Sequence, residues 1–320
     1  MYLMEVLHSL YIHQERRSNM KIRLGKHIEE AIKNNLPIVA LESTIISHGM
    51  PYPENVETAQ KCEEMVRQNG AVPATIAIIK GEAVVGLSPE EIDYIGRKGF
   101  EVVKVSRRDL PYVLTKKLDG ATTVSATMIL AEKAGIHVFA TGGIGGVHRK
   151  AEITMDISAD LEELANTNVC VVCAGAKAIL DLEKTLEYLE TKGVLVLGYG
   201  TDILPAFYTK TSPYPVNYRV DTPDEISEIL KTKWELGLNG GVLVTNPIPD
   251  EYSLNEEIMN KAIEEALKEM DALEITGKKV TPYLLGKIKD LTGGESLKSN
   301  IQLVLNNCAL ASLIAKGYQK

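Results

Sequence analysis

The sequence predicts an α/β protein, a three-layer α/β/α sandwich with a largely parallel or mixed central sheet. Two observations support this prediction. Segments with the 3.6-residue period of a helix alternate along the chain with short apolar segments typical of strands. Several of these strands are apolar at almost every position, as expected for a parallel sheet that helices cover on both faces.

The first elements after the N-terminal region follow this pattern. Residues 26–35 predict a short amphipathic helix, and the segment PIVALES at 37–43 predicts a strand. Residues 54–70 have helical spacing and end at Gly70, the position of a C′ glycine. Strands are predicted at 74–81 and 83–87. Ser88 and Glu91 then form a capping box with Pro89 at the first helical position, which marks a helix start.

The alternation continues toward the C-terminus. Thr222-Pro223-Asp224-Glu225 marks a further helix start, and residues 251–320 are expected to be mainly helical. The remaining predicted strands are 102–106, 136–143, 169–175, 194–200 and 240–249, and the remaining helices are 125–135, 158–167 and 177–193. No repeat or linker interrupts the pattern, so residues 20–320 are predicted to form one domain. Residues 1–19 are expected to be a mobile extension or a mis-assigned start.

Composition excludes several classes of function. The formal net charge of −8 argues against a nucleic-acid-binding surface, although it leaves room for a pocket that binds one phosphate. No apolar run is long enough to cross a membrane, and no secretory signal is evident. The four cysteines do not suggest a disulfide framework, so a reducing, cytoplasmic location is predicted. Cys170 and Cys173 have the spacing of a metal or redox pair, but the apolar run around them favours core packing.

Polar residues gather where the predicted strands end, which is where open α/β sheets bind ligands. Glu42 follows an apolar strand and precedes the polar stretch STIISHG, so it either caps a turn or belongs to an active site. Lys104 lies between two valines and must extend to solvent, pair or react, because burying an unpaired ammonium is costly. Arg107 and Arg108 follow it, as a solvated patch or as ligand contacts.

The next strand ends in the glycine-rich stretch TGGIGGVHR, which includes His148. Its glycine spacing is not that of a dinucleotide-binding fingerprint, but it fits a loop whose backbone approaches a ligand. Asp156 and Asp160 follow at a predicted helix start. Asp160 could complement the helix dipole, and as metal ligands the two would suit Mg²⁺ or Mn²⁺ rather than zinc. His148 is either a loop histidine or a ligand contact.

Lys177 is the strongest candidate for a nucleophile. It is predicted in the first turn of helix 177–193, where the helix dipole and any neighbouring lysine would disfavour its ammonium form. The alternative is a solvated lysine at a helix start. Gly293-Gly294 precede a predicted helix that carries Lys298 and Asn300, so this turn is either a phosphate site or an ordinary glycine turn. The last predicted strand ends at Asn246.

Eight segments together resemble the pseudouridine-5′-phosphate glycosidase family, also called indigoidine synthase A-like proteins. The similarity runs from about residue 27 to residue 319. The segments are ALESTIISHGMPYP, GAVPATIAII, KVSRRDLP, GATTVSATM, VFATGGIGGVHR, DISADLEELANTNVCVVCAGAK, LNGGVLVTNPIP and LTGGESLKSNIQLV.

The resemblance implies a lyase that reversibly cleaves the C–C glycosidic bond of pseudouridine 5′-phosphate to uracil and ribose 5-phosphate. It implies that Lys177 forms a ring-opened imine adduct with the sugar and that Glu42 donates a proton. It further implies that Asp156 binds Mn²⁺, or another divalent ion such as Mg²⁺, and that the protein is a homotrimer. The substrate contacts it implies are Lys104, Val124, His148, Ser158, Ala159, Asp160 and Asn300.

Two other functions remain possible from the residues alone. A class I aldolase-type enzyme would use Lys177 on another sugar phosphate and would release no uracil. A non-catalytic phosphosugar sensor would need no nucleophilic lysine. A kinase is disfavoured, because the glycine-rich C-terminal region contains no P-loop pattern.

Overall fold

A computed structural model describes residues 22–320, and the predicted extension at residues 1–19 lies outside them. Its main feature is one mixed sheet. The path of strands across it is β1-β4-β3-β2-β7-β9-β13-β11-β12, with β6 joined to β3 and β5 joined to β6. These strands are β1 (Ile22–Leu24), β2 (Ile38–Leu41), β3 (Val72–Ile79), β4 (Glu82–Val85), β5 (Val103–Val105), β6 (Gly120–Thr122), β7 (Val138–Ala140), β9 (Cys170–Cys173), β11 (Leu195–Tyr199), β12 (Tyr218–Val220) and β13 (Val242–Thr245).

The strands from β3 to β12 along this path all run parallel, and only β4 and β6 pair with β3 in the antiparallel direction. The carboxyl ends of β2, β7 and β9 therefore meet at one edge of the sheet. A separate antiparallel pair joins β8 (Val147–His148) to β10 (Leu180–Asp181). This pair brings the glycine-rich loop next to the segment that follows β9.

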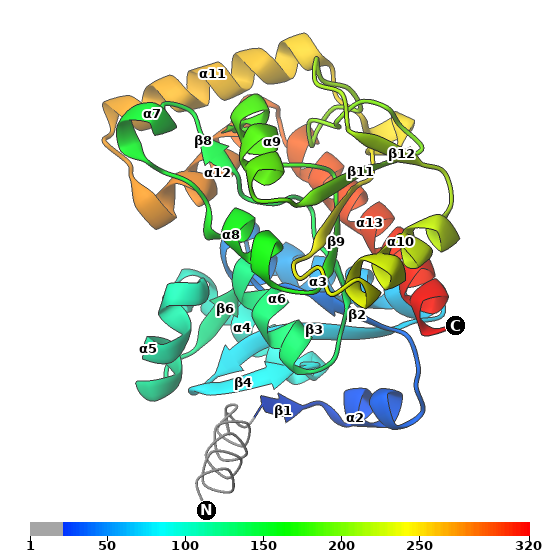
Figure 1. The fold of residues 1–320 in the computed structure, drawn as a ribbon. Coiled ribbons are helices and arrows are strands. Elements are labelled where there is room, and N and C mark those ends of the chain that lie inside the picture. The colour runs from blue at the N-terminus through cyan, green and yellow to red at the C-terminus, as the bar shows by residue number, and fades with distance from the viewer. Residues whose placement is uncertain (1–21) are drawn as a thin grey trace, which may run out of the picture.

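Helices cover the sheet on both sides, as predicted. On one side α13 packs on α3, α10, β2, β7 and β9, while α6, α8 and α9 pack together on the other (Figure 1). The helices are α2 (Lys26–Lys33), α3 (Glu54–Gln68), α4 (Pro89–Lys98), α5 (Leu110–Thr115), α6 (Val124–Lys133), α7 (Ala151–Thr154), α8 (Ala159–Asn166), α9 (Leu182–Thr191), α10 (Pro223–Glu235), α11 (Glu256–Ala272), α12 (Val280–Leu291) and α13 (Glu295–Gln319). The three-layer prediction is confirmed.

Local sequence signals account for several boundaries. Ser88 and Glu91 form the predicted capping box at the start of α4, and Thr222 and Glu225 form another at the start of α10. The polar stretch after β2 is not an open loop, because Ile45–Gly49 forms a single π-helical turn. Such turns are rare and occur often at functional sites.

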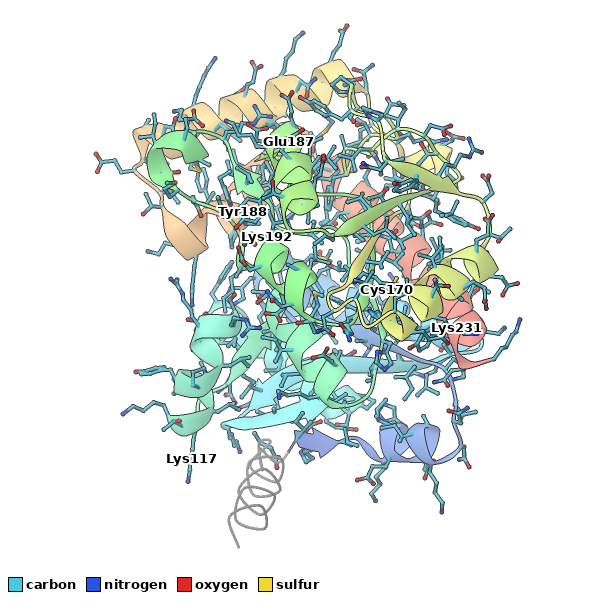
Figure 2. The ribbon with its side chains drawn as sticks, in the orientation of Figure 1. Lys117, Cys170, Glu187, Tyr188, Lys192 and Lys231 are labelled. Atoms are coloured by element: carbon cyan, nitrogen blue, oxygen red, sulfur yellow. The ribbon has the colours of Figure 1, made fainter. Side chains whose placement is uncertain are left out.

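The core lies between the sheet and the helices. Cys170 and Cys173 are fully buried with free thiols, which agrees with the prediction of core packing. Figure 2 shows Cys170 inside the molecule, whereas the charged side chain of Lys117 extends outward. Among residues 22–320, no helix is both long and apolar enough to span a membrane.

Candidate active site

A cavity of about 190 Å³ lies at the carboxyl ends of β2, β7 and β9. It is completed by β5, by the first residues of α6 and α8, and by residues of α12 and α13. The residues proposed from the sequence that line it are Glu42, Lys104, Val124, His148, Ser158, Asp160, Lys177 and Asn300. Asp156 and Ala159 do not line it. Residues far apart in the chain therefore meet in one cavity.

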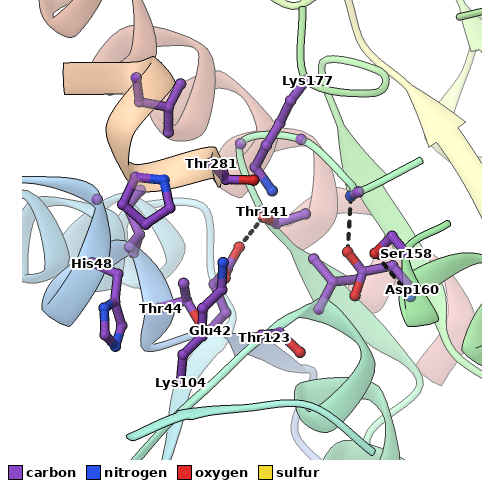
Figure 3. Close-up of a pocket in the computed structure, with 18 of the residues that line it drawn as sticks. Glu42, Thr44, His48, Lys104, Thr123, Thr141, Ser158, Asp160, Lys177 and Thr281 are labelled. Carbon is purple, nitrogen blue, oxygen red and sulfur yellow. Dashed lines mark hydrogen bonds between the residues drawn. The ribbon is translucent and has the colours of Figure 1, made fainter. Parts of the chain in front are cut away.

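Glu42 lies directly after β2 and projects into the cavity (Figure 3). The Thr141 hydroxyl donates a hydrogen bond to its Oε1 atom. Burial raises the pKa of the Glu42 carboxyl, although the charge of Lys177 and the bond from Thr141 act in the opposite direction. A carboxyl with a raised pKa keeps its proton closer to neutral pH, which suits a proton donor.

Lys104 and Lys177 bring two amines to the same cavity. Their side chains extend from opposite sides toward Glu42 and Thr141 (Figure 3). Burial lowers the pKa of Lys104, and the neighbouring charge of Lys177 lowers it further. The cavity thus favours loss of the proton from the Lys104 ammonium, and a neutral amine is a nucleophile.

The predicted position of Lys177 in a helix is wrong. Lys177 lies in the loop after β9, and its backbone N–H donates to the carbonyl of Ile144 at 3.1 Å. Helix α9 begins only at Leu182, where Asp181 is the N-cap residue. The helix dipole therefore does not act on Lys177, and Lys104 is the neighbouring charge.

Asp160 connects two segments of the cavity wall. One carboxylate oxygen accepts from the backbone N–H of Ser125 at 3.0 Å, and the other accepts from that of Gly145 at 2.8 Å. A Cβ atom on Gly145 would lie 2.2 Å from Oγ of Ser158, so this loop needs glycine for its close approach to α8. Each oxygen thus accepts one backbone N–H group, and Asp160 fixes the shape of the wall while it lines the cavity.

The first residues of α6 and α8 provide donors for an anion. Val124 and Ala159 begin these helices, so their backbone N–H groups have no partner within their own helix. Thr123 precedes α6, and its hydroxyl is buried without a hydrogen-bond partner among residues 22–320. Thr123, Val124 and Ser158 line the cavity, where Lys104 adds positive charge. These groups suit a phosphate.

Asp156 is the residue that the resemblance assigns to a metal. Its Oδ2 atom lies 4.0 Å from Nδ1 of His148, and its side chain is 44% exposed. In the described part of the chain, no group of three or more His, Cys, Asp or Glu side chains is placed to hold a metal ion. One carboxylate open to water fits a hydrated Mn²⁺ or Mg²⁺, which take oxygen ligands and keep several waters, but it does not fit zinc.

Two predicted positions, Arg107 and Asn246, serve other purposes. Arg107 forms a two-bond ion pair with Glu163, whose side chain is fully buried. Asn246 donates to Asn307, which in turn donates to the carbonyl of Thr141 and so supports the cavity wall.

The phosphate site considered at Gly293-Gly294 is not supported. The backbone N–H groups at the start of α13 bond to Thr292 and Gly294, and neither glycine lines the cavity. An ordinary glycine turn therefore describes this segment, and only Asn300 of α13, which is 8% exposed, reaches the cavity.

Several lining residues were not predicted from the sequence. Thr141 directly follows β7, and Thr123 directly precedes α6, so strand ends and helix starts could have indicated both. Thr281, Pro282 and Leu285 come from α12, and Phe207 comes from a long connection between β11 and β12. No local signal marks these four residues, because only tertiary packing brings them to the cavity.

Comparison with curated proteins gives long matches. The chain is 62% identical to a pseudouridine-5′-phosphate glycosidase from Clostridium botulinum over 92% of this chain and 96% of that protein. It is 59% identical to the protein of the same name from Escherichia coli, over 93% and 96% of the two chains.

Solved structures agree with these matches. The prealnumycin C-glycosynthase AlnA, solved with ribulose 5-phosphate, is 39% identical over 94% of this chain and 98% of its own, with a TM-score of 0.86. An indigoidine synthase A-like protein from Thermotoga maritima is 34% identical over 95% and 99% of the chains, also with a TM-score of 0.86. The model of the family described as indigoidine synthase A like protein matches residues 27–317. The chain therefore belongs to the indigoidine synthase A-like family.

Proposed function

We propose that this protein is a pseudouridine-5′-phosphate glycosidase, which reversibly cleaves its substrate to uracil and ribose 5-phosphate. The observation that carries the proposal is a single cavity in which two amines and a buried acid lie beside two helix N-termini. Relatives about 60% identical over nearly the whole chain bear this name. The structural neighbour AlnA is named for C-glycoside synthesis and was solved with a pentose phosphate.

The phosphate end of the substrate would bind at the first residues of α6 and α8. Val124 would donate its backbone N–H group, and the unpartnered hydroxyl of Thr123 would donate to a phosphate oxygen. Lys104 would add a charge-assisted contact. Asp160 would hold this site in shape by bonding to Ser125 and Gly145.

The chemistry of a C-glycoside explains why an amine is needed. O-glycosidases use a pair of carboxyl groups and protonate a leaving oxygen, but a C–C bond offers no such oxygen. The neutral amine of Lys177 would bond to C1′ while the C1′–O4′ bond breaks and Glu42 protonates O4′. The lysine nitrogen then gives up a proton, and its lone pair expels uracil, whose C5 atom takes a proton. Water hydrolyses the resulting imine and releases ribose 5-phosphate.

Asp156 would hold Mn²⁺ or Mg²⁺ with water as most of its ligands. When bound, the cation would supply positive charge that favours a phosphate-bearing ligand. We further propose, from the family resemblance, that the protein is a cytoplasmic homotrimer. Sedimentation equilibrium would test the trimer, because a monomer mass at micromolar concentration contradicts it.

Intact-protein mass spectrometry after borohydride reduction with ribose 5-phosphate tests the central step. We expect a reduced sugar-phosphate adduct on the native chain and on Lys104→Ala, but not on Lys177→Ala. Uracil release from pseudouridine 5′-phosphate distinguishes the glycosidase from an aldolase. Binding of ribose 5-phosphate without any adduct would overturn the mechanism and favour the sensor.

The same assay identifies the reaction step at which Glu42 donates its proton. In Glu42→Gln, an adduct that forms from pseudouridine 5′-phosphate and retains its uracil would place the essential proton at the C–C cleavage step. Absence of any adduct would place it at ring opening. The amide keeps the shape of the side chain, so the comparison isolates the proton.

A further inference from the structure

His48 lies at the end of the cavity opposite the proposed phosphate site. Figure 3 shows His48 on one side, Ser158 and Asp160 on the other, and Glu42 between them. A second cavity of about 270 Å³ adjoins this end and shares five lining residues with the first, namely His48, Gly49, Pro282, Leu285 and Asn300. If phosphate occupies the helix N-termini and the sugar lies at Glu42, the His48 end and the cavity beside it provide room for the base.

The surroundings of His48 fix which ring nitrogen carries hydrogen. Its Nε2 atom lies 3.0 Å from the carbonyl oxygen of Val102, and a carbonyl can only accept a hydrogen bond. Nε2 is therefore the protonated nitrogen, and Nδ1 of the neutral ring carries a free lone pair. The contact with Val102 is the only hydrogen bond of the His48 side chain found among residues 22–320. The edge of the ring also packs on Phe100, with ring centroids 5.4 Å apart.

The neutral form of the His48 ring is favoured by its burial and by two neighbouring lysines, and only the hydrogen bond to the Val102 carbonyl favours the protonated form. Burial lowers the pKa of His48 to about 4, helped by the charges of Lys104 and Lys278. Lys278 is held at this end by Asp109 at 2.8 Å and by the Lys104 carbonyl at 2.9 Å. At neutral pH the ring thus presents Nδ1 as a hydrogen-bond acceptor.

His48 is not the only acceptor at this end, because the side-chain amide oxygen of Asn300 also lines both cavities. Both oxygens of Asp160 accept backbone N–H groups, and Glu42 is needed as a proton donor. Uracil joined through C5 keeps two ring N–H donors, N1–H and N3–H, whereas uracil joined through N1 keeps only N3–H. A C-linked base therefore offers a donor that an ordinary nucleotide lacks.

We infer that His48 is a specificity residue whose Nδ1 accepts a hydrogen bond from a ring N–H of the C-linked uracil. The inference rests on the proposed function and identifies a side chain that recognises the base. A base without that donor would leave Nδ1 unpaired in a desolvated cavity, which penalises binding. The native enzyme should therefore reject such a base at least tenfold.

Three nucleotides test this inference, namely pseudouridine 5′-phosphate and its N1-methyl and N3-methyl derivatives. We expect native kcat/KM to fall at least tenfold for one methylated base. In His48→Ala, kcat/KM for the unmodified nucleotide should fall. The ratio of kcat/KM between the unmodified nucleotide and the methylated nucleotide that the native enzyme rejects should approach one. His137→Ala is the control, because this imidazole bonds to the carbonyl of Asn168, outside the cavity. Unchanged discrimination in His48→Ala would overturn the inference.

A measurement on the native chain tests the same inference without relying on a variant that could fold poorly. Nitrogen-15 NMR of histidine-labelled protein should show Nδ1 of His48 without hydrogen, and this signal should shift when uracil and ribose 5-phosphate are added. A hydrogen on Nδ1, or no shift at saturation, would overturn the assignment. If the native chain fails to cleave pseudouridine 5′-phosphate, the proposed function fails with it. Cleavage with unchanged discrimination removes only the role of His48.

Discussion

Replacing Thr141 with valine would remove the hydroxyl that donates to Glu42 and keep the β-branched shape of the side chain. Hydrogen bonds to charged groups contribute about 1.5–3 kcal/mol. The bond from Thr141 stabilises the carboxylate form and thus holds the pKa of Glu42 down. Since about 1.4 kcal/mol corresponds to one pH unit, its loss should let Glu42 keep its proton about one to two units further into the alkaline range.

The assay is kcat/KM against pH, followed by chromatographic release of uracil. The alkaline limb reports the loss of the catalytic proton, so it should move upward in Thr141→Val. Thr245→Val is a matched control, because Thr245 is also buried at a strand end and its hydroxyl donates to the Leu197 carbonyl at 2.9 Å. An alkaline limb that stays in place or moves downward in Thr141→Val, with a native-like control, would refute this account of Glu42.

Three further predictions concern ligand affinity and stability. Gly145→Ala should raise KM for the phosphorylated substrate at least tenfold, because its Cβ atom would displace the hydroxyl that caps α8. Gly286→Ala, inside α12, is its control, because a Cβ atom added there has no atom within 4 Å. It should raise Tm, since alanine in place of a helical glycine stabilises the fold by about 0.5–1 kcal/mol. Arg107→Ala should lower the urea-derived free energy of unfolding by about 2–3 kcal/mol, because it leaves the buried Glu163 carboxylate without its ion pair. Glu42→Gln should stabilise the fold increasingly as pH rises above about 4.5, since a carboxyl whose pKa rises on folding loses stability in that direction. An equal effect of Glu42→Gln at pH 4 and pH 8 in thermal melts would contradict the last prediction.

Local and periodic features of the fold were predictable from the sequence. The capping boxes at Ser88 and Thr222 involve residues three apart, so a short stretch of sequence identifies them without tertiary information. The acid at Glu42 was also evident, because a carboxylate at the end of an apolar strand has few structural uses. Its partner Thr141 lies 99 residues further along the chain, and only the pairing of β2 with β7 brings the two together.

Where prediction failed, non-local pairing overrode a local pattern. Residues 177–193 look like one helix, but Leu180 and Asp181 pair with the strand that contains His148, and this delays the helix to Leu182. Gly293-Gly294 resemble a phosphate loop, yet the side chain and carbonyl of Thr292 already accept N–H groups at that helix start. Neither competing partner is visible in a short sequence window.

The double acceptance by Asp160 has a consequence for ligand affinity. Its carboxylate ties the start of α6 to the glycine-rich loop through Ser125 and Gly145, with no ligand involved. The loss of backbone freedom needed to arrange this anion site is therefore incurred when the chain folds rather than when a substrate binds. Rigid sites of this kind bind more tightly for the same contacts. Asp160 thus converts part of the folding free energy of the protein into affinity for its ligand.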